Sequence, residues 1–506
     1  MTSATADTGH RRLTFGGVRG LIREHRWFVG ILALGVVLRL ATVIAYRPLL
    51  MRLTDTWGYL SLSWNLDIPR HFVIAPDRPF GYPLFLWILA RPFGFHAIIV
   101  TGVQHLAGLI TGTLAYATLV RLGVRRLLAV IAAAIILLDT YAIALEHTIL
   151  AESIYTVLLM AAAFLVVVPR SPLWAVPVAG LLLGAAGTLR LEALVAVLPW
   201  LAYVIWRHWR RPALIGLAVL GFAIPTGAYA IAHHHATGRF GFEDAGGTFL
   251  YGRVAGIADC SKFHVPAGTR ALCQPKSQRV DNPGAYIWDP QYSPARKLFP
   301  GGWGATAAQQ HSQDQVLGRF AKAVIRGEPV QYLGLAGRDF LRFFEPGIQP
   351  WEFEADLALP PAQNPDPGPL GNAVWPSYRN QTHWPAPVLS QVSKVLRTPR
   401  WLLGVTTLVA FVNLFMILAR AISRRPLGFP RKSASLVFNG IALITLVAAA
   451  ATSLYRARYM VSVAPLLVVG GTLAVEDALA EWKLASTLVS LVRPTRVRPA
   501  PVPSDG

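Results

Sequence analysis

The sequence predicts an all-α polytopic membrane protein with about ten transmembrane helices, interfacial helices in its first outer loop and a small extracytoplasmic domain. Of its 506 residues, 54% are hydrophobic and 14% are charged, whereas soluble domains carry about 25% charged residues. The mean hydropathy of +0.44 over this length requires several segments of about 20 apolar residues, each able to cross about 30 Å of hydrocarbon. A single soluble core does not account for this composition.

The apolar windows give the expected spans in chain order. The first window begins near Trp27 and is followed by no small-residue cleavage site, so we expect it to remain as a membrane helix rather than to act as a signal peptide. Hydropathy places the spans at residues 27–46, 96–120, 127–145, 153–168, 173–189, 192–206, 212–232, 401–420, 435–453 and 459–476.

The basic loops predict the orientation of these spans. Clusters of arginine precede the first span, follow the second, sixth and eighth spans, and lie in the tail. If the spans alternate in direction, all of these clusters fall on one side, which the positive-inside rule identifies as the cytoplasm. The clusters are Arg11, Arg12, Arg19, Arg23 and Arg26; Arg121, Arg125 and Arg126; Arg207, Arg210 and Arg211; Arg424, Arg425, Arg431 and Lys432; and Arg493, Arg496 and Arg498. The net charge of +21 therefore reflects topology, and we expect no nucleic-acid partner.

This topology divides the chain into five parts. They are a basic cytoplasmic N-terminus (1–26), a transmembrane catalytic module with a long first outer loop at 47–95 (27–232), an extracytoplasmic domain (233–400), C-terminal transmembrane helices (401–477) and a cytoplasmic tail (478–506). We expect the protein to lie in the plasma (inner) membrane, with its active site on the extracytoplasmic side.

Two outer segments are more than connectors. In the first outer loop, Trp57–Asn65 and Gly81–Ala90 have aromatic and apolar residues at helical spacing but are too short to span, which predicts interfacial helices. The domain at 233–400 is rich in Gly, Pro, Trp and Tyr and has a Pro-rich stretch around Leu357–Pro387. We expect this domain to be mixed α/β or irregular.

The two cysteines of the chain, Cys260 and Cys273, both fall in the extracytoplasmic domain. An oxidising compartment favours their pairing as a disulfide across a short loop. The alternative is two free thiols that are close in sequence.

Ionisable side chains gather at the predicted outer face, although such groups are costly near a membrane. Arg190 and Arg456 stand in short outer turns, against the positive-inside trend. A guanidinium group in such a place suits an anion, which it binds through forked hydrogen bonds. The gathered residues are Asp55, Tyr59, Asp77, Arg78, Glu146, His147, Glu152, Arg190, Glu192, Arg456 and Arg458.

Five short motifs on this face carry a resemblance to a known family. They are DTWGYLSLSWN (Asp55–Asn65), RPFGYPLF (Arg78–Phe85), LAES (Leu150–Ser153), GTLRLE (Gly187–Glu192) and RARY (Arg456–Tyr459). In this order they resemble the polyprenol-phosphate-dependent membrane glycosyltransferases of the C-type fold, a group that includes protein O-mannosyltransferases and aminoarabinose transferases. The resemblance covers residues 27–232 and the final helices, and does not extend to 233–400.

The resemblance implies that a sugar moves from a polyprenyl-phosphate donor to an acceptor, which is a cell-envelope glycan, a lipid or a protein, at the outer leaflet. The lipid phosphate leaves as an anion, so cations must hold its charge. Arg78 and Arg190 are similar to the family positions that hold this phosphate, and Arg458 is a third candidate. Among the remaining residues of these motifs, we expect Tyr59, Tyr82 and Glu192 to bind substrate.

The family resemblance also implies an acid–base residue. Asp55 resembles the first-loop acid, which would accept the proton of the acceptor hydroxyl, and Glu152 resembles a second acidic position. Many relatives have two adjacent acids in this loop, but Thr56 follows Asp55 here. A second carboxylate must therefore come from Asp77 or Glu152. No cofactor is predicted with certainty, and a divalent metal is left open.

Simpler roles compete for the same residues. Asp55 also fits a helix N-cap, Arg78 and Arg190 also fit side chains that reach toward headgroups, and Arg458 also fits a lipid-headgroup site. Glu146 and His147 fit a solvated turn. The run of histidines at 233–235 fits the end of an interfacial helix better than a metal site.

Other functions compete as well. A lipid-linked glycan ligase or polymerase would also use outer-face arginines. A secondary transporter would show Gly- or Pro-broken helices near the midplane and an internal repeat, neither of which the sequence displays. A transferase requires Asp55, Arg78, Glu152 and Arg190 around one lipid-accessible pocket.

Overall fold

The computed structural model describes residues 20, 22–51, 54–66, 75, 77–345, 358–366, 379–422 and 430–492. Residues 1–19, residues 367–378 of the Pro-rich stretch and the tail after residue 492 lie outside these ranges. The basic residues predicted to be cytoplasmic at 11–19 and 493–498 are therefore outside the described residues.

The protein is an all-α polytopic membrane protein, as predicted, because long apolar helices form wherever the sequence has an apolar window. Six helical stretches in the described ranges are long and apolar enough to cross a membrane, or up to seven if one bent pair counts as a span. They are built on α2 (Arg26–Ala45), α5 (Ala97–Arg121), α11 (Pro212–Thr237), α19 (Arg400–Ile422), α20 (Pro430–Thr452) and α21 (Ala457–Val492), with α6 (Arg126–Leu137) and α7 (Thr140–Glu146) as the bent pair.

The predicted count of about ten spans is not confirmed. Three of the predicted spans form the helices α8 (Glu152–Val167), α9 (Ala175–Leu189) and α10 (Glu192–His208), which have 16, 15 and 17 residues. At 1.5 Å per residue these helices are only about 22–26 Å long, which is less than the hydrocarbon thickness of about 30 Å.

The short helices form the centre of the module, and glycines allow them to pack closely. A Cβ on Gly180 or Gly184 of α9 would lie 2.3 or 2.4 Å from carbonyl oxygens of α11, and one on Gly221 of α11 would lie 2.2 Å from a carbonyl of α9. Such small-residue contacts are typical of helix pairs in membranes. Because α9 is held in this way, the turn that follows it, at Arg190, has a fixed position beside α8.

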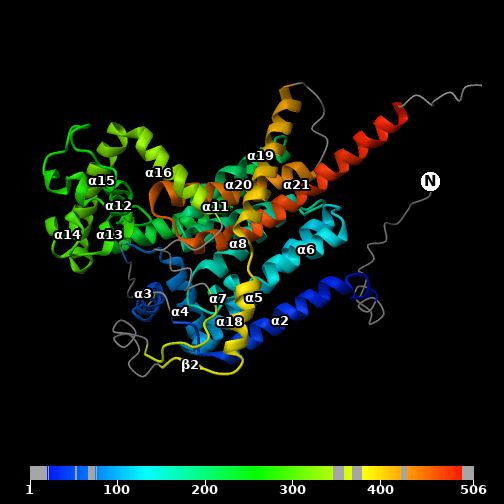
Figure 1. The fold of residues 1–506 in the computed structure, drawn as a ribbon, viewed down its shortest axis with the longest axis horizontal. Helices are drawn as coiled ribbons and strands as arrows, with labels where there is room; N and C mark the ends of the chain where they lie inside the picture. Colours follow the sequence, from blue (N-terminus) through cyan, green and yellow to red (C-terminus); the bar gives the residue numbers. More distant parts are fainter. Residues whose placement is uncertain are drawn as a thin grey trace, which may run out of the picture.

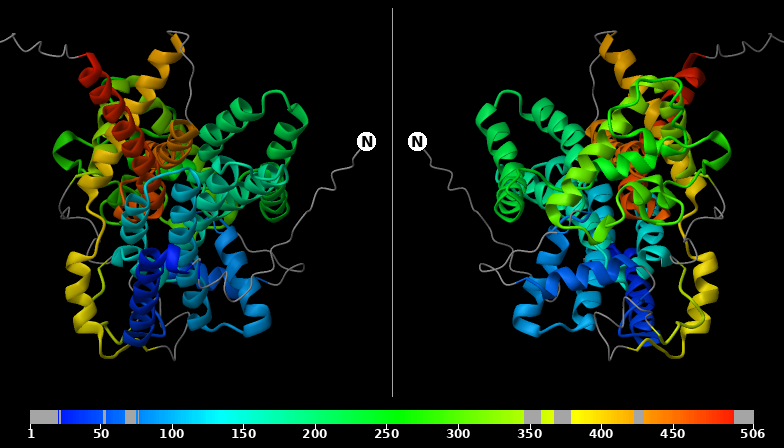
Figure 2. Two further views of the ribbon diagram at one scale, coloured as in Figure 1. Left: turned by 90° about the vertical axis from the view of Figure 1, so that its right-hand side faces the viewer. Right: turned by 90° about the vertical axis from the view of Figure 1, so that its left-hand side faces the viewer.

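The first outer loop contains both helices that the sequence predicts. They are α3 (Thr54–Trp64) and α4 (Gly81–Phe93), which pack against each other. A Cβ on Gly81 would lie 2.5 Å from the carbonyl oxygen of Thr188, so the start of α4 rests directly on the end of α9. Figures 1 and 2 show α3 and α4 together at one end of the molecule, where α18 (Ala386–Val395, yellow) also packs beside α2.

The described part of the domain at 233–400 consists of helices joined by irregular stretches, such as 256–282, so a mixed α/β fold is not observed there. It contains α12 (Gly246–Ala255), α13 (Pro283–Trp288), α14 (Pro294–Leu298), α15 (Ala307–Gly327), α16 (Pro329–Arg342) and α18, with short 3-10 turns at 270–272, 276–278 and 302–304. Figure 1 shows α12–α15 (green) grouped on one side of the molecule. Its one strand among the described residues, β2 (Gln381–Thr382), pairs antiparallel with β1 (Tyr46–Arg47).

Two local features explain why this domain is ordered in spite of its many Gly and Pro residues. Helix α15 begins with a capping box, in which the side chains of Thr306 and Gln309 each accept a hydrogen bond from the other residue's backbone N–H. Cys260 and Cys273 form a disulfide beside a core that contains Tyr251 and Phe320. Polar faces on amphipathic helices, rather than irregular backbone, account for the low hydropathy of the segment.

Candidate active site

Three predicted site residues from distant parts of the chain meet at one point. Oδ1 of Asp55 accepts a hydrogen bond from Nη2 of Arg78 at 3.0 Å, and Oδ2 accepts one from Nη2 of Arg458 at 2.5 Å. Nε of Arg78 also lies 3.5 Å from Oδ2 of Asp77. Both oxygens of Asp55 are therefore engaged by guanidinium groups.

The remaining predicted charged residues, Glu152, Arg190 and Glu192, form a chain of contacts that begins at Arg458. Oε1 of Glu152 lies 3.5 Å from Nε of Arg458 and accepts a hydrogen bond from Nη1 of Arg190 at 2.6 Å. Nη2 of Arg190 donates to Glu192 at 3.2 Å. Four carboxylates and three arginines thus alternate in sign along one row, which we call the charged row: Asp77, Arg78, Asp55, Arg458, Glu152, Arg190 and Glu192.

The charged row lies where several helices begin. Asp55 is in the first turn of α3, Glu152 and Glu192 are the first residues of α8 and α10, and Arg458 is the second residue of α21. A helix N-terminus has a partial positive charge and unpaired N–H groups. Converging N-termini stabilise the carboxylates already present, and they would also stabilise a bound anion.

The arginines also determine the protonation of Asp55. Burial by itself would raise the pKa of Asp55, but the charges of Arg458 and Arg78 outweigh it and lower the pKa to about 2. Burial instead raises the pKa of Asp77, which Arg78 offsets only in part. Asp55 is consequently ionised at neutral pH, and as long as it remains paired it is a weak base.

Aromatic rings enclose the arginines. The guanidinium carbon of Arg78 lies 5.8 Å from the ring centre of Tyr59, and that of Arg190 lies 4.5 Å from the ring centre of Tyr459. Tyr82 is fully buried, meets Tyr59 edge to face, and donates its hydroxyl proton to Gln104 at 2.6 Å. The structure therefore brings Tyr59 to the charged row but turns the hydroxyl of Tyr82 away from it.

Gln104 was missed by the sequence analysis. Its Nε2 donates to the carbonyl oxygens of Glu146 and Thr148 at 2.8 and 2.7 Å. Because Gln104 also accepts the hydrogen bond from Tyr82, it connects the turn before α8 with α4, the helix that follows Arg78. A buried glutamine in the apolar window of α5 was the available signal.

Glu146 and His147 are not a solvated turn, because both are buried. Glu146 accepts hydrogen bonds from Nε and Nη2 of Arg39 at 2.8 and 2.7 Å, and lies 2.8 Å from Nδ1 of His105. Nε2 of His105 lies 3.1 Å from Nδ1 of His147, whose Nε2 faces the carbonyl oxygen of Tyr46 at 2.7 Å. We call this the buried network; the bend before α7 returns Glu146 to the interior.

A cavity of about 330 Å³ lies next to the charged row, between α7, the start of α19 and the start of α21. Tyr141, Arg397 and Arg400 line one part of it, and Leu403, Met460 and Val461 line another. Its wall includes Ala457, the neighbour of Arg458 in the chain. The four residues required around one pocket are thus brought together by the structure, but they do not line this cavity.

The segment at 233–400 meets the site through Tyr229. Its hydroxyl accepts a hydrogen bond from the N–H of Phe80 at 3.1 Å and donates to the carbonyl of Phe242 at 2.9 Å. Glu243 follows Phe242, and in the described part of the chain its carboxylate has no hydrogen-bond or ion-pair partner. Burial raises the pKa of Glu243 to about 7, and the charge of Glu192 adds to the rise. This carboxylate was not predicted.

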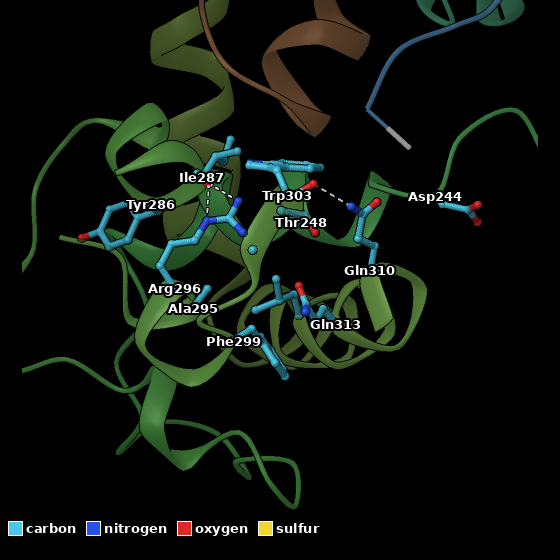
Figure 3. A pocket seen from close by; sticks show the side chains of 12 residues that line it. Asp244, Thr248, Tyr286, Ile287, Ala295, Arg296, Phe299, Trp303, Gln310 and Gln313 are labelled. Carbon is cyan, nitrogen blue, oxygen red and sulfur yellow. Dashed lines mark hydrogen bonds between the residues drawn. The ribbon is translucent and has the colours of Figure 1, made fainter. Parts of the chain in front are cut away.

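A second hollow, within residues 233–400, is already filled by its own side chains. Arg296 lies over the ring of Trp303 at 5.0 Å and donates twice to the carbonyl of Ile287 (Figure 3). The free space of about 10 Å³ is the size of about one water molecule. We therefore do not assign a substrate to this hollow.

The described residues do not form a metal site that could be recognised. No three His, Cys, Asp or Glu side chains within them are arranged to hold a metal ion. The run at 233–235 lies in the last turn of α11, where Nδ1 of His233 bonds to the carbonyl of Arg239 at 2.9 Å. In the charged row, both carboxylate oxygens of Asp55 accept hydrogen bonds from arginines.

Comparisons with known proteins agree with this picture. The family model of the dolichyl-phosphate-mannose-protein mannosyltransferases matches residues 84–227. Over these residues the chain is similar to membrane glycosyltransferases. The match confirms the predicted resemblance to polyprenol-phosphate-dependent enzymes, and it includes Glu152, Arg190 and Glu192 of the charged row.

The chain also has a weak similarity to a solved structure. The archaeal oligosaccharyltransferase AglB from Archaeoglobus fulgidus, in complex with an inhibitory peptide and a dolichol-phosphate, superposes with a TM-score of 0.41 at 13% identity over 94% of this chain. The chain covers 53% of that protein, so it spans about half of its length. No curated protein matches this chain.

Proposed function

We propose that this protein moves a sugar from a polyprenyl-phosphate donor to an acceptor hydroxyl at the outer leaflet. The observation that carries the proposal is the charged row, which concentrates Arg78, Arg190 and Arg458 at converging helix N-termini. Charge-assisted hydrogen bonds from arginine suit a phosphate that becomes more negative as the sugar leaves. The match to a family named for a dolichyl-phosphate-mannose donor supports the same donor class.

In the proposed reaction, Asp55 accepts the proton of the acceptor hydroxyl while the hydroxyl oxygen attacks the anomeric carbon of the sugar. A carbon–oxygen bond to the acceptor forms, and the bond from the anomeric carbon to the phosphate oxygen breaks. The polyprenyl phosphate leaves with the bonding electrons, held by the arginines. Glu152 positions Arg190 and Arg458, Asp77 positions Arg78, and Tyr59 and Glu192 are proposed to contact the sugar.

The cavity beside Arg458 supports a lipid-borne donor. Part of it is apolar, at Leu403, Met460 and Val461 on two predicted membrane spans, and it adjoins the first turn of α21. A carrier chain could leave the charged row along this side of α21 without crossing polar surface.

Radiolabelled polyprenyl-phospho-sugars, given one at a time to membranes that contain the protein, test the proposal. We expect transfer of label from one of these donors to a product that membranes with the Asp55→Asn variant do not make. If no donor gives a product that depends on the wild-type protein, the proposed function is wrong. If only a pyrophosphate-linked oligosaccharide donor is used, the chain is a ligase instead.

The outward orientation of the site is also a proposal, supported by the basic loops that lie on the opposite ends of the helices. Single cysteines at Val124 and Ala285, in a variant without Cys260 and Cys273, would report it through a membrane-impermeant thiol reagent on intact cells. We expect labelling at 285 and none at 124. The reverse pattern would place the charged row on the cytoplasmic side.

A further inference from the structure

The carboxylate proposed as the base and the cations proposed to hold the phosphate are paired with each other. Arg78 and Arg458 occupy both oxygens of Asp55, at 3.0 and 2.5 Å. A carboxylate that is paired with two guanidinium groups is a poor proton acceptor. The two guanidinium groups, for their part, already have a carboxylate as their anionic partner, so they are not free to bind a phosphate. The site as described is therefore closed to both steps of the reaction until this pairing changes.

We propose that the phosphate of the lipid donor replaces Asp55 as the anionic partner of Arg78 and Arg458, so that donor binding releases Asp55 to act on the acceptor. This inference rests on the proposed function and adds the order in which the two substrates bind. The donor binds first, and the acceptor hydroxyl meets a competent base only in the donor complex.

Unused donor capacity on Arg458 supports the exchange. Nε of Arg458 is buried and has no hydrogen-bond partner among the described residues, since its nearest carboxylate, Glu152, is 3.5 Å away. A phosphate oxygen could accept from Nε and Nη2 together, which is the forked geometry that arginine offers to phosphates. Asp55 uses only Nη2.

Space beside Arg78 also supports the exchange. The guanidinium group of Arg78 lies on Gly58 of α3, so closely that a Cβ on Gly58 would be 1.3 Å from Nη1. Because there is no side chain at this position, residue 58 does not confine the guanidinium group to its contact with Asp55. Asp77 at 3.5 Å and the ring of Tyr59 at 5.8 Å remain as its neighbours.

The release would change the proton affinity of Asp55 considerably. Its pKa is about 2 in the paired state, and 3.8 is its ordinary value. If both arginines turn from Asp55 to a phosphate, the pKa of Asp55 would return at least to the ordinary range, because burial and a nearby anion both raise it. A rise of about two units is roughly a 100-fold gain in proton affinity.

Carbodiimide labelling measures this change, because a carbodiimide activates the protonated form of a carboxyl group, which then couples to an added amine. The purified full-length protein is labelled at pH 6 with and without a short-chain polyprenyl phosphate, and modification of Asp55 is quantified by peptide mass spectrometry. We expect polyprenyl phosphate to raise the labelling rate of Asp55 by at least 10-fold. The matching polyprenol, which has no phosphate, should leave the rate unchanged.

The Arg458→Gln variant provides the control for access. Without lipid, its Asp55 has lost one arginine and should label faster than in the wild-type protein. With lipid at a concentration that saturates the variant, as judged by its thermal stabilisation, any decrease in labelling measures how much the bound lipid itself shields Asp55, and the wild-type rates are corrected by this factor.

The thermal stabilisation of the protein by polyprenyl phosphate is measured separately. It distinguishes failure of the proposed exchange from failure of the proposed donor class. If the lipid stabilises the protein but the corrected labelling of Asp55 stays constant or falls, the exchange is wrong while the proposed donor class stands. If the lipid does not stabilise the protein at any concentration, the proposed donor class and the exchange both fail. If polyprenol raises the labelling as much as polyprenyl phosphate does, the phosphate is not what displaces Asp55.

Discussion

Oδ2 of Asp55 accepts a hydrogen bond from Nη2 of Arg458 at 2.5 Å, although the two residues are 403 positions apart in the chain. This contact joins the segment at 47–95 to α21, and residues 233–400 lie between them in the sequence. The charged row is therefore complete only when the C-terminal helices pack on the module formed by residues 27–232. A truncation before α19 would remove a proposed phosphate ligand as well as three candidate spans.

Removal of the proposed phosphate ligands should weaken donor use. We expect Arg78→Ala and Arg190→Ala each to lower kcat/KM for the donor by roughly 10- to 100-fold, because a charge-assisted hydrogen bond contributes about 1.5–3 kcal/mol. Arg190→Lys should restore only part of the loss, since an ammonium group has no planar fork. The control is Arg126→Ala, whose partner Glu24 is exposed. Wild-type turnover of both alanine variants at low donor concentration would refute the phosphate role.

Asp55→Asn separates a catalytic role from helix capping. Asparagine is tolerated at the start of a helix about as well as aspartate and keeps one oxygen that can accept from an arginine, so the variant should still insert and fold, with a lower melting temperature because Arg78 and Arg458 lose a charged partner. Loss of a general base should lower kcat by roughly 10²- to 10⁴-fold. Turnover at saturating donor and the melting temperature are measured together. Near-normal turnover would leave Asp55 with a structural role and move the search for the base to Glu152, Asp77 or Glu243.

Gly58→Ala should reduce activity while it stabilises α3. Alanine in a helix interior is favoured over glycine by about 1 kcal/mol, but its Cβ would occupy the place of the Arg78 guanidinium group. We expect a higher KM for the donor with an unchanged or higher melting temperature. Gly102→Ala on α5, where a Cβ meets nothing within 4 Å, is the matched control. Equal donor KM values in both variants would mean that Arg78 relocates freely.

The sequence predicted the positions of the helices well because apolar windows report burial in lipid directly. The topology predicted from the sequence also placed five site residues on one face: Asp55, Arg78, Glu152, Arg190 and Arg458. It could not show which arginine pairs with which acid, because these contacts join residues far apart in the chain.

The buried network was missed for a different reason. Periodicity over the seven residues of α7 cannot show that the chain bends back and buries Glu146. A usable signal did exist, since Arg39 stands inside the first apolar window, and a charge in such a place requires a partner.

Glu146→Gln should destabilise the protein strongly. Arg39 and Glu146 are both almost completely buried, and loss of one partner from a buried pair costs about 3–5 kcal/mol. The matched control is Glu24→Gln at the exposed pair with Arg126, where we expect a change below about 1 kcal/mol. Thermal unfolding in detergent compares the two variants. Equal melting temperatures would show that the buried network contributes no more than a surface pair.

Glu243→Gln should stabilise the protein at alkaline pH. The pKa of Glu243 is raised from 4.5 to about 7, so the folded state binds a proton more tightly than the unfolded state. Stability is therefore lost as pH rises from about 4.5 to 7, and glutamine removes this loss. We expect the variant to exceed wild type by up to about 2 kcal/mol at pH 8 and by little at pH 4. A difference that does not change with pH would contradict the burial of this carboxylate.

The buried network also couples the orientations of its two imidazole rings. Nδ1 of His105 faces Glu146, Nε2 of His105 faces Nδ1 of His147, and Nε2 of His147 faces the carbonyl of Tyr46. A neutral imidazole has a single N–H, so the tautomer of one histidine constrains the tautomer of the other. The N–H of Leu50 donates to the backbone carbonyl of His147, so the segment that leads to Asp55 is tied to this pair of rings.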